Sequence, residues 1–475
     1  MKPRSRAVAK AASTSAVATA LSRRRMARRQ LAILGGHLVD PKLGIDGVAD
    51  VFLSDGKVAE VRPAGSDPRA YRANGPEMVI DASGCYVLPG LIDMHVHLRT
   101  PGQEEKEDPK SGGQAAARGG FTTICCMPNT KPALDNPRLI EEMLARFRGE
   151  CPVRVIPFAA MTKGNRGERL TDFAALKGAG VAGISDDAHP VQGFSLAHRG
   201  FRKAVEEDLL LSLHSEDLSL RDPATGLATP EAEEIMIARN VALTSDTGAR
   251  LHLCHLSTAR GMAFLELAKA AGMAVTAEVT PHHLLLNEGN VVRQGAVAKV
   301  NPPLRPEKDR LALLDGVKRG LVDVIATDHA PHLWDEKQHE FTRAPAGIVG
   351  LETALSLVYT NLGLDMANIV RLMSLRPAQI LGLPDRGHLG PGARADVVIF
   401  DAKKTWKIEG KDFLSKAKFT PFEGFEVRGE VVATVVGGEV VYESGGLAGR
   451  KRAKDEGGRL VLLNAVAGSG KEAAG

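Results

Sequence analysis

The sequence of 475 residues lacks several features that define other classes of protein. No run approaches the roughly 18 consecutive apolar residues that a membrane span needs, so we expect no membrane association. The five cysteines form no C-x-x-C pair and most lie within apolar stretches, which predicts reduced, buried thiols and a cytoplasmic location. No G-x-S-x-G elbow is present, which argues against a covalent serine mechanism. The C-terminal GSGK lacks the spacing of a phosphate loop.

The net charge of +4 is concentrated at the two ends of the chain. Residues 1–29 carry nine Lys or Arg and no acid, and residues 446–475 carry six bases and three acids, so the residues between them have a net charge of −8. An acidic body argues against nucleic-acid binding. The leader 1–30 has the composition of a transit peptide, but we favour a disordered extension or a start assigned too early. We expect 446–475 to be a C-terminal tail.

Two segments far apart in the chain share a β-type pattern. Residues 31–86 and 387–445 consist of short β-branched runs separated by turn residues, and we expect them to be halves of one small β-sandwich. Between them, residues 87–386 contain eight apolar runs separated by helix-length segments with capping residues at their starts. Eight strands, each followed by a helix, predict an α/β fold of the (β/α)8 TIM barrel type.

Polar side chains close nearly every one of the eight apolar runs. These residues are His95, His97, Asn129, Asp186, Asp187, His214, His255, His282 and Asp328. Polar residues are common after strands, but the catalytic groups of barrel enzymes also lie where strands end. So many side chains of the metal-ligand type at these positions predict a functional site at one rim of the barrel.

His95 and His97 close the first barrel strand, and alternation along a strand puts both on one face. Alone the pair is a weak signal, because about 0.4 H-x-H pairs are expected by chance from 14 histidines. His214, His255 and Asp328 complete a set of ligands that zinc accepts. Two neighbouring metals need a bridging anion, which the pair of aspartates in GISDDAHPV offers, unless that pair only caps a loop.

The chemistry expected from this set is amide hydrolysis. Two zinc ions lower the pKa of a shared water and polarise an amide carbonyl, and Asp328 is the candidate to carry the proton to the leaving nitrogen. Arg99 follows the H-x-H pair by two residues, and a guanidinium fork suits a carboxylate. Asn129, Asn301 and His332 offer further hydrogen bonds. We therefore expect an anionic small-molecule substrate.

A series of motifs runs in order along roughly residues 31–445. They are DMHVHLRTPGQEEKED, GGFTTICCMPNTKPALD, ISDDAHPV, HSEDLSL, HLCHLST, AEVTPHHLLL, NPPLR, IATDHAPH and GIVGLETAL. Together they resemble the motifs of the dihydroorotases, the longer bacterial class within the amidohydrolase superfamily. The resemblance implies the reversible cyclisation of N-carbamoyl-L-aspartate to L-dihydroorotate, with loss of water, in de novo pyrimidine (UMP) synthesis.

The resemblance also implies roles for individual residues, position by position. The implied ligands of two zinc ions per subunit are His95, His97, Asp187, His214, His255 and Asp328, with Asp328 also the general base. The implied substrate contacts are His97, Arg99, Asn129, Asn301, His332 and the backbone at Ala346 and Gly347. We expect a homo-oligomer and consider aspartate transcarbamoylase as a partner.

Two alternatives stay open. Hydantoinase-like or allantoinase-like enzymes use the same centre, but they usually carry a carboxylated lysine at the fourth strand, where VAGISDDAHPV has no lysine. A non-catalytic partner of aspartate transcarbamoylase is a second alternative, although such relatives have lost metal ligands and this chain keeps the full set. The chain departs from the family pattern at Thr100, Ser215 and Ala346, which replace Glu, Cys and Phe. None removes a ligand, and only substrate packing near Ala346 is in question.

Overall fold

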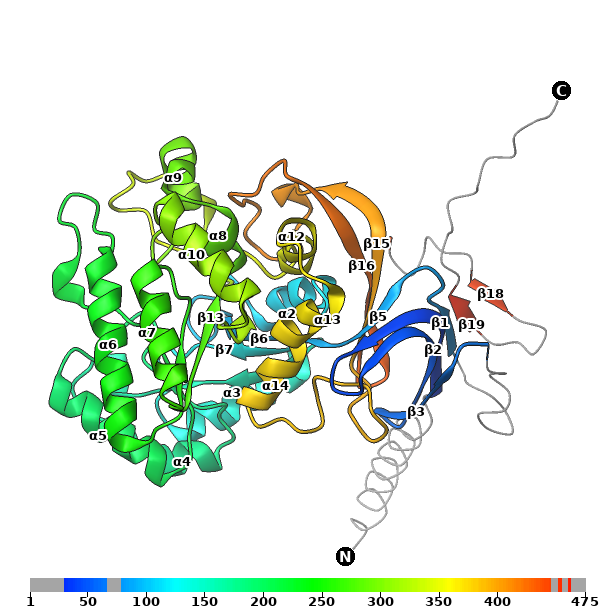
Figure 1. Cartoon of the computed structure of the whole chain (residues 1–475), viewed down its shortest axis with the longest axis horizontal. Helices are drawn as coiled ribbons and strands as arrows, with labels where there is room; N and C mark the ends of the chain where they lie inside the picture. The colour runs from blue at the N-terminus through cyan, green and yellow to red at the C-terminus, as the bar shows by residue number, and fades with distance from the viewer. Residues whose placement is uncertain (1–29, 66–77, 446–451, 455–459, 463–475) are drawn as a thin grey trace, which may run out of the picture.

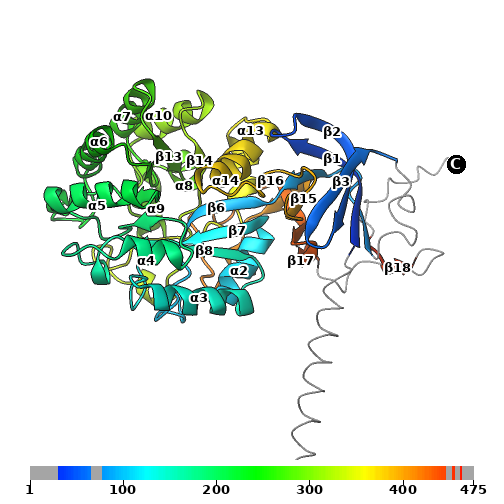
Figure 2. The same cartoon turned by 90° about the horizontal axis from the view of Figure 1, so that it is seen from below.

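The computed structural model describes residues 30–65 and 78–445, together with two short strands, β18 (Arg452–Lys454) and β19 (Leu460–Leu462). The predicted leader, apart from its last residue, and most of the predicted tail lie outside the described residues. In the described part, a barrel occupies one side of the molecule and a β-sandwich the other (Figures 1 and 2). None of the helices found there combines the length and the apolar character needed to cross a membrane.

Eight parallel strands form the barrel within the described residues. They are β6 (Leu91–Val96), β7 (Phe121–Cys126), β8 (Arg154–Pro157) continued by β9 (Ala159–Ala160), β10 (Ile184–Ser185), β11 (Leu211–Leu213), β12 (Leu251–Leu253), β13 (Val275–Val279) and β14 (Val324–Ile325). A parallel bridge between Val96 and His329 joins the last strand to the first and closes the ring. The predicted (β/α)8 barrel is confirmed, and each of the eight apolar runs contains one of these strands.

Helices cover the outside of the barrel. They include α2 (Pro109–Arg118), α3 (Pro137–Glu150), α4 (Phe173–Gly178), α5 (Phe194–Glu206), α6 (Pro230–Thr247), α7 (Ala259–Ala270), α10 (Glu307–Lys318), α12 (Ala354–Asn361), α13 (Met366–Val370) and α14 (Arg376–Ile380). Several begin at side chains that accept a backbone N–H of the first turn, such as Asn136, Thr229 and Thr258. Shorter helices lie in the loops that follow the last two strands, namely α8 (Pro281–Leu285), α9 (Glu288–Gln294) and α11 (Trp334–Lys337).

The two ends of the chain share one strongly bent sheet. Its strands are β1 (Gln30–Asp40), β2 (Ile45–Ser54), β3 (Lys57–Pro63), β4 (Met78–Asp81), β5 (Tyr86–Pro89), β15 (Val397–Lys407), β16 (Glu426–Val436) and β17 (Glu439–Glu443), with β18 and β19. β5 pairs with β15, so N-terminal and C-terminal segments meet as predicted for the sandwich. β1 bulges between Ile33 and Gly36, and pairs with β4 before the bulge and with β5 after it. The bulge bends β1, so the two parts of this strand can pair with two different strands, β4 and β5.

The connection between β15 and β16 leaves the sandwich and packs on the barrel. We call its residues 408–425 the strap; it contains the short turn η6 (Gly410–Asp412). Phe413, Phe419 and Phe422 of the strap form a separate apolar cluster with barrel-loop residues, including Leu286, Val300 and Ile348. The strap therefore joins the two units. The domain limits at 31, 87, 387 and 445 stay predictions.

Candidate active site

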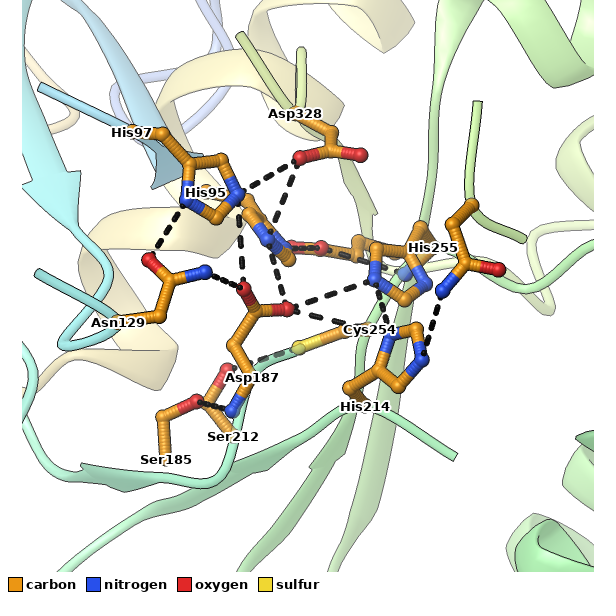
Figure 3. A network of polar contacts seen from close by, with 12 residues as sticks. His95, His97, Asn129, Ser185, Asp187, Ser212, His214, Cys254, His255 and Asp328 are labelled. Atoms are coloured by element: carbon orange, nitrogen blue, oxygen red, sulfur yellow. Dashed lines mark hydrogen bonds and ion pairs between the residues drawn. The ribbon is translucent and has the colours of Figure 1, made fainter. Parts of the chain in front are cut away.

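The six predicted metal ligands meet at the carboxyl ends of the barrel strands (Figure 3). Nε2 of His95 lies 3.4 Å from Oδ1 of Asp187 and 3.5 Å from Oδ1 of Asp328. Nε2 of His97 lies 3.1 Å from Oδ1 of Asp328 and 3.5 Å from Oδ2 of Asp187. These four side chains, drawn from three different strand ends, form the first ligand group.

A second group lies on the other side of Asp187. Oδ1 of Asp187 is 3.7 Å from Nε2 of His255 and 4.0 Å from Nδ1 of His214, and those two nitrogens are 3.0 Å apart. Asp187 thus belongs to the first group and also lies within 4.0 Å of the second, as expected for the predicted bridging carboxylate. Its neighbour Asp186 accepts the backbone N–H of Val191 instead, and burial raises the pKa of Asp186 to about 6.

The chemistry of these side chains fits a divalent metal. Nε2 of His95 is buried and has no hydrogen-bond partner within the described residues. The ligand atoms of His95, His97 and Asp328 lie within 4.8 Å of one another, as do those of His95, Asp187 and His255. Burial alone would lower the pKa of His95, but Glu278, Asp328 and Asp187 together raise it. The surplus of carboxylates around imidazole nitrogens favours a bound cation.

Two buried carboxylates that the sequence analysis did not single out hold the histidines. Oε1 of Glu278 in β13 lies 2.6 Å from Nδ1 of His95, and Oε2 of Glu216 lies 2.8 Å from Nε2 of His214. Each contact fixes one ring nitrogen so that the other faces the ligand group. The sequence does contain a signal that could have identified Glu278, because a glutamate is unusual within an apolar run such as AVTAEV.

The backbone is strained at this rim of the barrel. Arg99, Ala188, His255 and Asp328 have φ angles of 56°, 61°, 33° and 47°. Residues other than glycine rarely adopt positive φ, at a cost of about 1–3 kcal/mol each, and such strain persists only where the surroundings fix it. The strain therefore marks a rim where side-chain placement is tightly constrained.

A cavity of about 350 Å³ opens beside the ligand groups. It is lined by His97, Asp187, His214, His255 and Asp328, and by Arg99, Asn129, Asn301, His332, Ala346 and Gly347. His95 lies within the barrel and is fully buried. The structure thus brings every residue predicted to contact substrate to the wall of one cavity, while the roles of these residues stay predictions.

One part of the cavity wall is suited to a carboxylate. Nη2 of Arg99 lies 3.1 Å from Nε2 of His332, and Nε of Arg99 donates to the carbonyl of Pro331. Burial, and then the charge of Arg99, lowers the pKa of His332 to about 2, so this imidazole is neutral. Nδ2 of Asn129 donates to Asp187, and Oδ1 of Asn129 lies 3.0 Å from Nδ1 of His97. Asn129 therefore connects this wall to the first ligand group.

The wall at Gly347 has no room for a side chain. Its φ is 136°, and a Cβ there would lie 2.6 Å from the carbonyl oxygen of Ala330. The carbonyl of Ala346 lies 2.9 Å from Nε2 of His332. His282, which closes another apolar run, lies in α8, and its buried Nε2 has no hydrogen-bond partner within the described residues.

Two cationic side chains that line the cavity were not predicted from the sequence. Arg221 and Lys299 line the cavity, and Nε of Arg221 donates to Glu216 at 2.6 Å. Nζ of Lys299 donates to the carbonyl of Phe341. No local pattern distinguishes these two from the many other lysines and arginines of the chain.

Cys254 lies beneath the ligands, although alternation along β12 would direct its side chain to the face opposite His255. Its Sγ lies close to ligand atoms of His95 and Glu278, and 3.2 Å from Oγ of Ser212. Strict alternation fails here because β12 ends at Leu253 and His255 has a positive φ. Burial raises the pKa of the Cys254 thiol to about 12, which fits a packing role and not that of a nucleophile.

Known proteins match both the sequence and the fold. Residues 84–261 match the Dihydro-orotase-like family. The chain is 42% identical over 428 residues to a dihydroorotase of Geobacter metallireducens, covering 87% of this chain and 99% of that protein. It is also 42% identical over 432 residues to a dihydroorotase of Anaeromyxobacter dehalogenans, and this match covers 87% of this chain and 98% of that protein.

Several similar solved structures are hydantoinases. An L-hydantoinase (dihydropyrimidinase) from Arthrobacter aurescens has a TM-score of 0.80 and 26% identity, covering 88% of this chain and 96% of that one. A D-hydantoinase has a TM-score of 0.78 and 25% identity, and this match covers 87% of this chain and 95% of that one. The match and the His and Asp groups together indicate an enzyme with a metal cofactor and a small-molecule substrate. By its identity to these relatives over most of its length, the chain belongs to the dihydroorotase family.

Proposed function

We propose that this protein is a zinc-dependent dihydroorotase, which interconverts N-carbamoyl-L-aspartate and L-dihydroorotate in pyrimidine synthesis. The observation that carries the proposal is the convergence of both ligand groups and of Arg99 on one cavity. The family relationship, at about 42% identity over most of the chain, supports the same activity.

We assign two zinc ions to each chain. His95, His97 and Asp328 would hold one, His214 and His255 the other, and Asp187 would contact both. When bound, zinc supplies Lewis-acid activation of water and polarises the amide carbonyl of the substrate. The buried, unpartnered Nε2 of His95 supports this assignment.

Asp328 is assigned as the general base. Burial alone would raise its pKa, but His95 and His97 lower the pKa of this carboxyl, so it is ionised and can accept a proton. In ring opening, Asp328 accepts the proton of the attacking water and transfers it to the leaving ring nitrogen. In ring closure the same carboxylate takes the proton from the ureido nitrogen as that nitrogen bonds to the carboxyl carbon, and gives it to the hydroxyl that leaves this carbon as water.

The remaining cavity residues bind and orient the substrate. Arg99, His332 and Asn129 would hold the carboxylate that both the open and the cyclic substrate carry, since charge-assisted hydrogen bonds to guanidinium are the strongest available there. Asn301 and the backbone at Ala346 and Gly347 would contact the ring amide. A substrate anchored in this way reaches from Arg99 to the ligand groups within one cavity.

A hydantoinase activity is the second candidate, because several similar solved structures are hydantoinases. The discriminating test is the turnover of N-carbamoyl-L-aspartate, dihydroorotate, hydantoin and allantoin by purified, zinc-loaded protein. We expect turnover of the first two, and turnover of hydantoin or allantoin alone would reject the proposal. About two zinc ions per chain with turnover also excludes a non-catalytic partner of aspartate transcarbamoylase.

We further propose a homo-oligomer that works in the cytoplasm. Light scattering of the purified protein, alone and mixed with aspartate transcarbamoylase, tests both self-association and that partnership. A monomeric mass at micromolar concentration would reject the homo-oligomer.

A further inference from the structure

A buried chain of hydrogen bonds links the strap to the metal centre. Oγ of Ser415 in the strap donates to Oε2 of Glu107 at 2.5 Å, and the same oxygen lies 3.3 Å from Nε2 of His329. All three side chains are fully buried. Glu107 lies in the loop between β6 and α2, and His329 follows Asp328 directly. The link therefore connects the sandwich to the end of the eighth barrel strand.

His329 is held through both its ring and its backbone. Nδ1 accepts the backbone N–H of Gly350 at 3.3 Å, so Nε2 carries the proton and donates to Glu107. The carbonyl of His329 accepts the N–H of His97 at 2.8 Å, and its own N–H donates to Oγ1 of Thr327. His329 is thus joined to two proposed ligands, to Asp328 by the chain and to His97 by a hydrogen bond.

Asp328 depends on such support because its backbone is strained. Its φ is 47°, and a residue other than glycine keeps such a conformation only where its neighbours hold it there. On one side, the N–H of Thr327 donates to the buried carboxylate of Asp93. On the other side the restraint is His329. A displacement of about 1 Å at a reacting group is enough to slow catalysis about 100-fold.

A second buried carboxylate fixes the strap at the point of contact. Glu352 accepts the backbone N–H groups of Leu414 and Ser415 at 2.9 and 3.0 Å, and pairs with Arg118 at 3.0 Å. Ser415 is therefore presented to Glu107 in a defined position, which a loosely packed loop would not provide.

We propose that Ser415, Glu107 and His329 are positioning residues, through which the strap holds Asp328 and His97 in the geometry that metal retention and turnover require. The inference rests on the proposed function for the roles of Asp328 and His97. It gives the sandwich a part in catalysis, although no described residue of its strands lines the cavity.

The test compares two hydroxyl deletions in the strap. Ser415→Ala removes the contact with Glu107, whereas Thr420→Ala removes a buried hydroxyl whose one contact among the described residues is the N–H of Phe422, within the strap. We expect Ser415→Ala to lower kcat about 10-fold with KM within about 2-fold, and to release zinc faster to a chelator. Thr420→Ala should match the wild type in kcat, in KM and in the rate of zinc release. Glu107→Gln should lower kcat and speed zinc release more than Ser415→Ala does, because Glu107 contacts both Ser415 and His329.

Equal kcat and equal zinc release in Ser415→Ala and Thr420→Ala would overturn the inference and leave the strap a purely structural connection. Thermal unfolding midpoints of both variants show whether a shared loss of stability accounts for any change. Zinc release needs no substrate, so this test remains valid even if the wild type proves inactive on dihydroorotate, an outcome that would reject the proposed function instead.

Discussion

His95 is fully buried and backed by Glu278, and His214 is backed by Glu216, whereas Arg99 on the cavity wall is partly exposed. Carboxylates surround the predicted ligands, and the cavity wall also carries three cations, Arg99, Arg221 and Lys299, of which Arg221 donates to Glu216. We call the predicted ligands with their carboxylates the metal set, and the three cations the cationic set.

This contrast indicates that the two sets have different roles, one in metal binding and turnover and the other in substrate binding. Side chains of the metal set hold or orient the proposed metal ligands, so substitutions there should change metal binding and turnover. Side chains of the cationic set supply positive charge to the cavity wall, so substitutions there should change affinity for the anionic substrate. The following variants test this division, in order of decreasing expected effect.

Asp328→Asn should lower kcat about 10³-fold or more, because a neutral amide cannot accept a proton. Steady-state kinetics and zinc content measured on the same sample check this, since loss of metal has to be separated from loss of the base. A variant that keeps both its zinc and a tenth of the wild-type kcat would show that another group carries the proton.

Arg99→Ala should lower kcat/KM by up to about 100-fold, mainly through KM, because it removes charge-assisted hydrogen bonds to the substrate carboxylate. Arg99→Lys keeps the charge without the planar fork and should recover part of the loss. Zinc content should match the wild type in both variants. An unchanged KM in Arg99→Ala would assign the carboxylate to Arg221 or Lys299 instead.

Glu278→Gln should weaken zinc binding about 10-fold, because the carboxylate that orients His95 loses its charge. Competition with a chromophoric chelator measures the affinity. Glu266→Gln is the control, since Glu266 pairs with Arg319 on the exposed surface. Equal affinities in the two variants would mean that His95 needs no support from Glu278.

Cys254→Ser should change kcat by less than about 2-fold, because the thiol is buried and neutral. Iodoacetamide labelling of the native wild type, followed by mass spectrometry, should leave Cys254 unmodified. A loss of turnover above 10-fold would make this thiol part of the metal set.

Residues that close a strand were predictable from the sequence, and residues that support them mostly were not. The period-two spacing of His95 and His97 and the eight apolar runs are local patterns. Glu216 and Glu107 carry no such pattern, because a glutamate in a loop is usually solvated. Cys254 shows the limit of local reasoning, since alternation predicts side-chain direction only while the strand continues.

The sequence by itself determined the barrel, the sandwich and the chemical types of the side chains at the rim, because periodicity and ligand type are properties of short segments. Only the tertiary structure decided which groups meet. His97 and Asp328 are 231 positions apart, and Ser415 and Glu107 are 308 apart. Contacts at such separations arise from closure of the ring and from the strap's return to the barrel, and no local pattern encodes either.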